Sequence, residues 1–167
     1  TVARVGEFTT ALHSLHVGDR LWVRGPFGNG FSLAGRHLLL VGGGYGVAPL
    51  HFLARAALAK HGQVSVIVGA RTAADLLFLE RFADLGVTVV TTTDDGSAGR
   101  AGQVTAGVRQ LVSAAAEPFD QLYACGPNAM LLTLADLATG LGLPAQLSWE
   151  NKMRCAIGIC GTCERDG

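Results

Sequence analysis

The sequence has no excess of charge of either sign. Its 167 residues include 13 lysines and arginines and 13 aspartates and glutamates, which gives a formal net charge of zero. A protein that is drawn to nucleic acid or to an anionic membrane by bulk electrostatics carries a basic excess. We therefore expect neither as a partner. With 49% hydrophobic and only 16% charged residues, the chain can bury a sizeable core.

Long apolar runs and a secretory signal are also missing. Runs such as "HLLLVGGG" and "DLLFL" are much shorter than the roughly 20 residues that a membrane-spanning helix needs. No basic start precedes an apolar stretch, as it would in a signal peptide. Only four cysteines occur, three of them in one cluster, which favours a cytoplasmic protein over a disulfide framework. The first residue is Thr1 and not Met, so we expect a processed or partial chain.

Glycine, by contrast, is abundant and follows many of the apolar runs. The 23 glycines are about twice the usual share. From His37 onward, short apolar runs alternate with segments of helical periodicity, which predicts a five-stranded parallel sheet with helices on both faces. The expected strands lie within 37–42, 63–71, 87–93, 119–126 and 145–150, and the expected helices within 47–62, 72–86, 102–115 and 127–142. The second helix begins with a T-x-x-D capping box at Thr72.

Residues 1–33 have a different character. The stretch "DRLWVRGPFGNGF" contains one β-rich run, 20–24, followed by a turn rich in glycine and proline, and no helical pattern precedes it. Such a piece cannot form a core of its own, so we interpret it as the end of an upstream β-domain. Residues 34–149 form the α/β domain, and a cysteine-containing segment, 150–167, follows it.

The stretch "LLLVGGGYGVAPL", residues 38–50, predicts a dinucleotide site. Open parallel sheets bind ligands beyond the carboxyl ends of their strands, and glycines there let the backbone approach the ligand. The helix that follows would offer free N–H groups to a pyrophosphate. The pattern is not a strict G-x-G-x-x-G, and tight packing of the turn is the alternative explanation. The motif "YACGPNAML" places Cys125, Gly126 and Pro127 at the same edge, which favours a ligand site.

Cys155, Cys160 and Cys163 have the spacing C-x4-C-x2-C. This spacing is typical of the plant-type 2Fe–2S loop, whose fourth thiolate comes from further along the chain. Zinc is the alternative metal, but its sites usually begin with a shorter cysteine spacing. Cys125 belongs to the sheet edge and is not assigned as the fourth ligand. We therefore expect an incomplete iron–sulfur segment.

Together these motifs resemble those of the electron-transfer subunit of NAD-linked, class 1B dihydroorotate dehydrogenase, in the ferredoxin-reductase superfamily. The resemblance covers essentially the whole chain, from "VGEFTTALHSLHVGDRLWVRGPFGNGF" through "VGGGYGVAPL" and "YACGPNAML" to "LSWENKMRCAIGICGTC". It implies that 1–33 is the end of an FAD-binding β-barrel. It also implies that 34–149 is an NAD-binding domain, and that 150–167 begins a 2Fe–2S segment.

The resemblance further implies an oxidoreductase component that works as an electron relay in pyrimidine biosynthesis. A catalytic partner subunit would oxidise dihydroorotate, and electrons would pass through 2Fe–2S and FAD to NAD or NADP. Related gamma subunits of hydrogenases and sulfhydrogenases, and NADH-dependent ferredoxin:NADP reductases, share much of the pattern. A non-catalytic nucleotide-binding or zinc-binding docking module is the alternative from another class.

The resemblance assigns residues as well. Gly6 and Thr9 match positions that contact the FAD pyrophosphate, although Phe8 stands where the family usually has glycine. Cys125 would lie near the hydride path, and the three clustered cysteines would hold the iron. The residues expected to contact NAD are Gly43, Gly44, Gly46 and Val47, with Gly126 and Pro127 opening the nicotinamide slot. Arg71 leaves the choice between NAD and NADP open. Asp94 and Asp95 are expected to cap a helix or to form a turn rather than to contact a ligand.

Overall fold

A computed structural model of the chain describes residues 2–164. It divides into two compact units, one formed by Phe31–Glu150 and the other by residues 1–30 and 151–167. Residue 1 and residues 165–167, which belong to the predicted terminal segments, lie outside the described residues. None of the helices formed by the described residues is long and apolar enough to cross a membrane.

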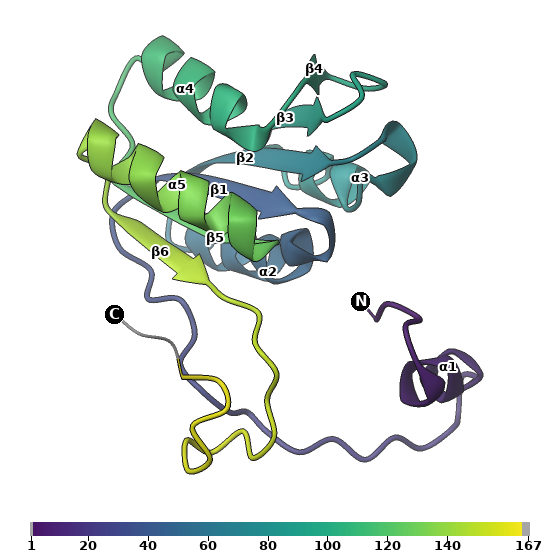
Figure 1. The fold of residues 1–167 in the computed structure, drawn as a ribbon. Helices are drawn as coiled ribbons and strands as arrows, with labels where there is room; N and C mark the ends of the chain where they lie inside the picture. Colours follow the sequence, from purple (N-terminus) through teal and green to yellow (C-terminus); the bar gives the residue numbers. More distant parts are fainter. Residues whose placement is uncertain (1, 165–167) are drawn as a thin grey trace. The chain divides into compact units, whose positions relative to one another are not determined.

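The larger unit is built on a parallel sheet with the strand order β4-β3-β2-β1-β5-β6 (Figure 1). The strands are β1 (His37–Gly43), β2 (Gln63–Ala70), β3 (Thr88–Thr93), β4 (Arg100–Ala101), β5 (Gln121–Cys125) and β6 (Ala145–Ser148). The predicted parallel α/β class is confirmed, and the predicted count of five strands is corrected to six. The additional strand, β4, has two exposed residues and no apolar signal, so hydrophobic periodicity could not reveal it.

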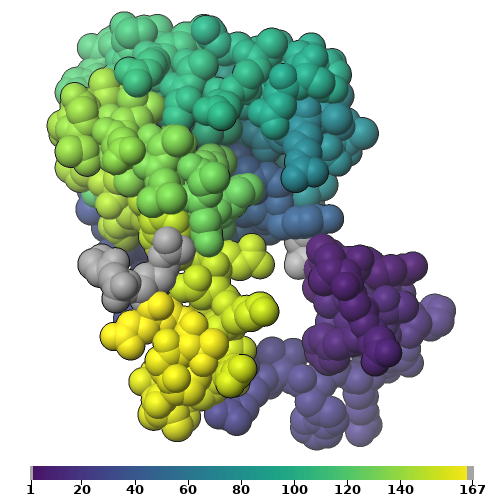
Figure 2. All heavy atoms as spheres, in the orientation of Figure 1, coloured from purple at the N-terminus to yellow at the C-terminus, as the bar shows by residue number. Residues whose placement is uncertain are grey.

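Helices cover both faces of the sheet, as expected. On one face lie α2 (Val47–Leu58) and α3 (Leu79–Ala83), and on the other α4 (Val104–Ala114) and α5 (Asn128–Leu141) (Figure 1). The side chains of α4 and α5 cover the face that is turned toward the viewer in Figure 2. Because side chains alternate along a strand, Leu38 and Leu40 pack on the α2 side while Leu39 and Val41 pack on the α5 side. This two-sided burial explains the continuous apolar run of β1.

The expected helix over 72–86 is wrong in its extent. Thr72 donates a hydrogen bond to the Asp75 carboxylate at 3.0 Å, but the helical turn that follows, η2 (Ala73–Asp75), stops at once. Leu76 is extended, and Phe78 has a left-handed φ of +65° before α3 begins. Leu76, Leu77 and Phe78 all pack against the buried cluster on the α2 face. Tertiary packing therefore overrides the local helical preference.

The smaller unit differs from the expectation for residues 1–33. Its N-terminal part contains a helix, α1 (Glu7–His13), which the sequence pattern did not predict. The β-rich run 20–24 forms no strand, and residues 2–30 contain none. Trp22 is 93% and Val23 83% exposed, so the apolar side chains of this run have no sheet to pack on. A strand needs a hydrogen-bonded neighbour. The assignment to a flavin barrel stays a prediction.

Candidate functional site

The predicted ligand edge coincides with the point where the strand order of the sheet reverses. The strands β2, β3 and β4 lie on one side of β1, and β5 and β6 lie on its other side. In such sheets the crevice beyond the carboxyl ends of the two strands at the reversal is the usual ligand site. Gly42 of β1 and Cys125 of β5 are register partners there. The glycine-rich turn and the C-G-P motif therefore meet at one place.

Packing requires two of the glycines at this edge, Gly42 and Gly46, and a flexible side chain crowds a third, Gly43. A Cβ at Gly46, in the short helix η1 (Gly44–Gly46), would overlap the carbonyl group of Cys125 and lie 2.6 Å from the Gly126 nitrogen. A Cβ at Gly42 would lie 2.6 Å from a methyl group of Val47, and one at Gly43 would lie 2.7 Å from the Met130 sulfur. The turn after β1 is therefore pressed against the end of β5.

Gly44 differs from these three glycines. Its φ is +53°, and an added Cβ would meet nothing within 4 Å. Because the space beside its backbone is open, packing does not explain a glycine here, whereas the left-handed turn does. The open side is where a ligand can approach the main chain. The packing explanation thus accounts for Gly42, Gly43 and Gly46 but leaves room for a ligand at Gly44.

Two helices begin at this edge and present their N-terminal N–H groups to it. The helix α2 starts directly after η1, and α5 starts directly after Pro127. Neither helix has an acidic residue in its first turn, so no carboxylate competes with an anionic ligand. The Val47 side chain is buried in the core, and its N–H bonds back into η1. A contact from Val47 to a coenzyme stays a prediction.

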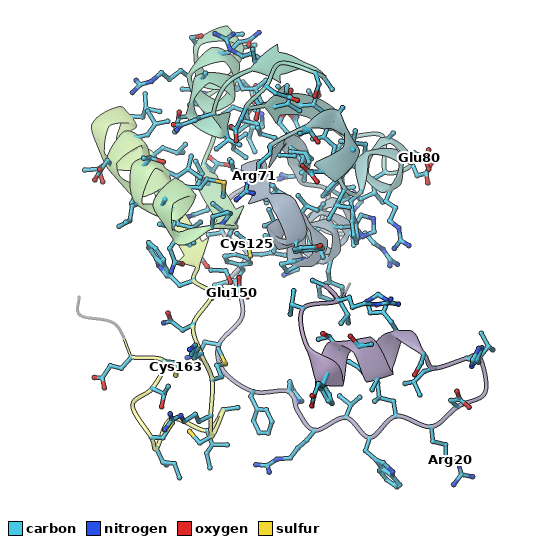
Figure 3. All side chains as sticks on the ribbon, turned by 45° about the vertical axis from the view of Figure 1, so that its right-hand side comes forward. Arg20, Arg71, Glu80, Cys125, Glu150 and Cys163 are labelled. Carbon is cyan, nitrogen blue, oxygen red and sulfur yellow. The ribbon has the colours of Figure 1, made fainter. Side chains whose placement is uncertain are left out.

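The thiol of Cys125 lies half-buried at the end of β5, beside two residues that the sequence reasoning missed. Ser148, its register partner on β6, hydrogen-bonds to it, and the Glu150 carboxylate acts on it electrostatically. Burial is the main cause that raises the pKa of the Cys125 thiol, and the negative charge of Glu150 raises the pKa further, while Ser148 opposes them. Figure 3 shows Cys125 and Glu150 in this region. Both lie within the predicted strand 145–150, but the sequence carries no signal for the pairing with β5 that brings Ser148 beside Cys125.

We predict that Cys125 reacts slowly with iodoacetamide. Because burial raises the pKa of its thiol, only a small fraction of it is thiolate at neutral pH, and the rate should rise only at alkaline pH. Glu150→Gln should increase the rate at pH 8.5, since it removes a charge that opposes the thiolate, and Ser148→Ala should decrease it. Mass spectrometry of the Cys125 peptide measures the rate, with urea-unfolded protein as the reference. A slower reaction in Glu150→Gln would contradict this electrostatic assignment.

The turn that follows β3 and leads to β4 uses Asp95, as expected, and it is hydrogen-bonded to the end of β2. The Asp95 carboxylate accepts hydrogen bonds from the Ser97 N–H at 2.9 Å and the Ser97 hydroxyl at 2.6 Å. These bonds are the main cause that lowers the pKa of Asp95. The Asp94 N–H donates to the Ala70 carbonyl at 3.1 Å. Arg71, one residue beyond β2, is exposed at this end of the sheet (Figure 3).

The cysteine segment has donors of the right type, but they are not gathered. Cys155 and Cys163 are partly exposed and Cys160 is exposed. Hydrogen bonds, first from Thr162 and then from Cys155, lower the pKa of Cys160 to about 6. Gly158 and Gly161 have the positive φ expected of a loop that wraps a cluster. Within residues 2–164, however, no three His, Cys, Asp or Glu side chains are placed to hold a metal ion.

The predicted flavin contacts, Gly6 and Thr9, lie at the start of α1. The Thr9 hydroxyl accepts hydrogen bonds from the N–H groups of Val5 at 2.9 Å and Gly6 at 3.0 Å, and it donates to the Gly6 carbonyl. The hydroxyl is thus occupied by its own turn. A contact of Gly6 or Thr9 with a flavin stays a prediction.

Comparison with known proteins gives a consistent picture. The oxidoreductase NAD-binding domain family matches residues 40–136, more than half of the chain. The chain is 46% identical over 163 residues to a protein of Methanothermobacter thermautotrophicus named probable dihydroorotate dehydrogenase B (NAD(+)), electron transfer subunit. It is 43% identical over 162 residues to the electron transfer subunit of dihydroorotate dehydrogenase B (NAD(+)) of Bacillus caldolyticus. These matches cover 98% and 95% of the chain and 60% of each relative.

Among solved structures, a close match is one that bears on flavin-based electron bifurcation by an NADH-dependent reduced ferredoxin-NADP oxidoreductase. The two chains share 34% sequence identity with a TM-score of 0.82. The match covers 97% of this chain and 58% of the other. The chain therefore spans only about three fifths of the length of the proteins that it resembles.

Proposed function

Since the chain belongs to the oxidoreductase NAD-binding domain family, we propose that the edge formed by β1 and β5 binds NAD. We further propose that the full-length protein is the electron-transfer subunit of an NAD-linked dihydroorotate dehydrogenase in the cytoplasm. The observation that carries the proposal is the meeting of the glycine-rich turn with Cys125 and Gly126 at the reversal of strand order. The sequence identity of 46% with a probable electron transfer subunit of dihydroorotate dehydrogenase B supports the choice of dihydroorotate as the electron source.

In this proposal the chain supplies the coenzyme site and the first part of a cluster segment. Gly44 and the N-termini of α2 and α5 receive the pyrophosphate, while Gly126 and Pro127 shape the slot for the nicotinamide beside Cys125. A 2Fe–2S cluster held by Cys155, Cys160 and Cys163 with a fourth ligand would carry single electrons from the catalytic partner subunit. A flavin in the full-length protein would accept these single electrons one after the other and pass two of them to NAD together.

Titration of the full-length protein with NADH and with NADPH tests the coenzyme assignment. We expect saturable NADH binding and at least about tenfold weaker NADPH binding, a difference of about 1.4 kcal/mol. The quenching of intrinsic fluorescence or calorimetry measures both affinities. Tighter binding of NADPH would overturn the choice of NAD and would direct attention to Arg71 as the partner of the ribose phosphate. If neither coenzyme binds saturably, the proposal fails.

A ferredoxin:NADP reductase subunit is a second candidate, and the match with a TM-score of 0.82 favours it. The two candidates differ in their electron donor. Dihydroorotate-dependent formation of NADH by the full-length protein with its purified partner supports the first, and reduced ferredoxin as the only effective donor supports the second. A colourless protein that contains zinc would instead indicate a docking module, because flavin and iron–sulfur clusters both absorb visible light.

A further inference from the structure

The segment that enters the larger unit, residues 31–34, is held by two side chains of the sheet. The Tyr123 hydroxyl donates to the Ser32 carbonyl at 2.8 Å and accepts from the Ala34 N–H at 2.8 Å. The Gln146 amide accepts from the Ser32 N–H at 2.9 Å and donates to the Ser32 carbonyl at 2.8 Å. We call this arrangement of Tyr123 and Gln146 around the segment the clasp.

The clasp supplies hydrogen-bond partners both to the backbone of residues 31–34 and to the buried hydroxyl of Tyr123. The segment forms neither helix nor strand, so its backbone N–H and carbonyl groups need other partners. The Gln146 amide supplies them as a paired strand would, with one donor and one acceptor on the same residue. Tyr123 is fully buried, and a buried tyrosine needs a partner for its hydroxyl. The Phe31 ring packs edge-on against the Tyr123 ring, with centroids 5.3 Å apart.

The clasp lies next to the candidate coenzyme edge. Tyr123 and Gln146 are register partners on β5 and β6, and Cys125 and Ser148 are the pair two residues further along the same strands. Because side chains alternate with a period of two, both pairs project from the same face of the sheet. Two residues of strand span about 6.6 Å. The segment is therefore fixed one row of side chains away from the Cys125 thiol.

We propose that Tyr123 and Gln146 are positioning residues that fix the entering segment relative to the Cys125 edge. This segment is the covalent link from residues 2–30, which the resemblance assigns to the flavin-binding part, to the sheet. Under the proposed function, loosening it would therefore affect electron transfer more than coenzyme binding. The inference rests on the proposed function for its turnover measurement. In this proposal both residues act through residues 31–34, which their hydrogen bonds hold.

The test uses the full-length protein with Gln146→Ala and Tyr123→Phe, and with Gln110→Ala as the matched control. Gln110 is also a hydrogen-bonded glutamine, since it accepts from Arg100 at 3.0 Å, but it lies on α4. We expect the Ser32 amide in Gln146→Ala and the Ala34 amide in Tyr123→Phe to exchange hydrogen at least about tenfold faster than in the wild type. The control should leave both amides unchanged. Tyr123→Phe keeps the buried ring, so the variant retains its packing.

Turnover separates a positioning role from a merely structural one. With ferricyanide as oxidant, each NADH yields NAD⁺ and a proton and reduces two ferricyanide ions. We expect both clasp variants to lower kcat at least about fivefold while KM and the Kd of NADH stay within about twofold. Faster amide exchange with unchanged kcat would overturn the inference alone. Failure of the wild type to bind NADH would overturn the proposed function and the inference with it.

Discussion

Replacement of Gly46 by alanine will abolish saturable NADH binding at concentrations that saturate the wild type. The added Cβ would overlap the Cys125 carbonyl and lie 2.6 Å from the Gly126 nitrogen, and both are backbone groups that cannot rotate away. The η1 turn must therefore move off the end of β5, which takes the start of α2 with it. We expect an affinity loss of at least about 100-fold and a free energy of unfolding lower by about 1–3 kcal/mol.

Two further glycines are compared with Gly46: Gly140 is the control outside the proposed site, and Gly44 lies within it. Gly140, within α5, has nothing within 4 Å of an added Cβ, so Gly140→Ala should raise the free energy of unfolding by about 0.5–1 kcal/mol without changing NADH affinity. Gly44 is also open but has a φ of +53°, so Gly44→Ala should cost about 1–2 kcal/mol of backbone strain. NADH titration and urea unfolding measure the three variants. Wild-type NADH affinity in Gly46→Ala would show that this turn is not part of the site.

The sheet could be predicted because its strands are buried on both faces. The run from Leu38 to Val41 is apolar at every position, which marks the strand without any knowledge of its neighbours. The strand β4 carries no such mark, since Arg100 and Ala101 are exposed and are ordered by pairing with β3. The interruption at Phe78 was equally hidden, because Leu76, Leu77 and Phe78 pack against a cluster that is built by other parts of the chain.

The candidate coenzyme edge, too, could be predicted only in part from the sequence. The glycine-rich turn and the C-G-P motif were predictable because each directly follows an apolar run. Which glycines are needed for packing and which one is open depends on how closely η1 approaches β5, and only the folded chain gives that distance. Ser148 belongs to the edge through the β5–β6 register, which links residues more than 20 positions apart, and Glu150 follows two residues later. A single sequence does not reveal such a pairing.

Under the proposed function, replacement of any one of the three clustered cysteines by serine will remove the iron from the full-length protein. A 2Fe–2S cluster needs four soft ligands, and an alcohol is a poor substitute for a thiolate. We expect about two iron atoms per wild-type chain and less than about a tenth of that in Cys155→Ser, Cys160→Ser and Cys163→Ser. Elemental analysis and the visible absorption of protein purified without oxygen measure this loss.

Cys125→Ser is the matched control, because it removes a thiol at the coenzyme edge. Cys125 is half-buried beside Ser148, in a different unit from the clustered cysteines, and its thiol was not assigned as a ligand. The variant should therefore keep the iron and the visible spectrum of the wild type. Loss of iron in Cys125→Ser would make it the fourth ligand and would contradict the assignment of two separate sites. Wild-type protein with one zinc and no iron would contradict the electron relay itself, since zinc has no redox chemistry to offer.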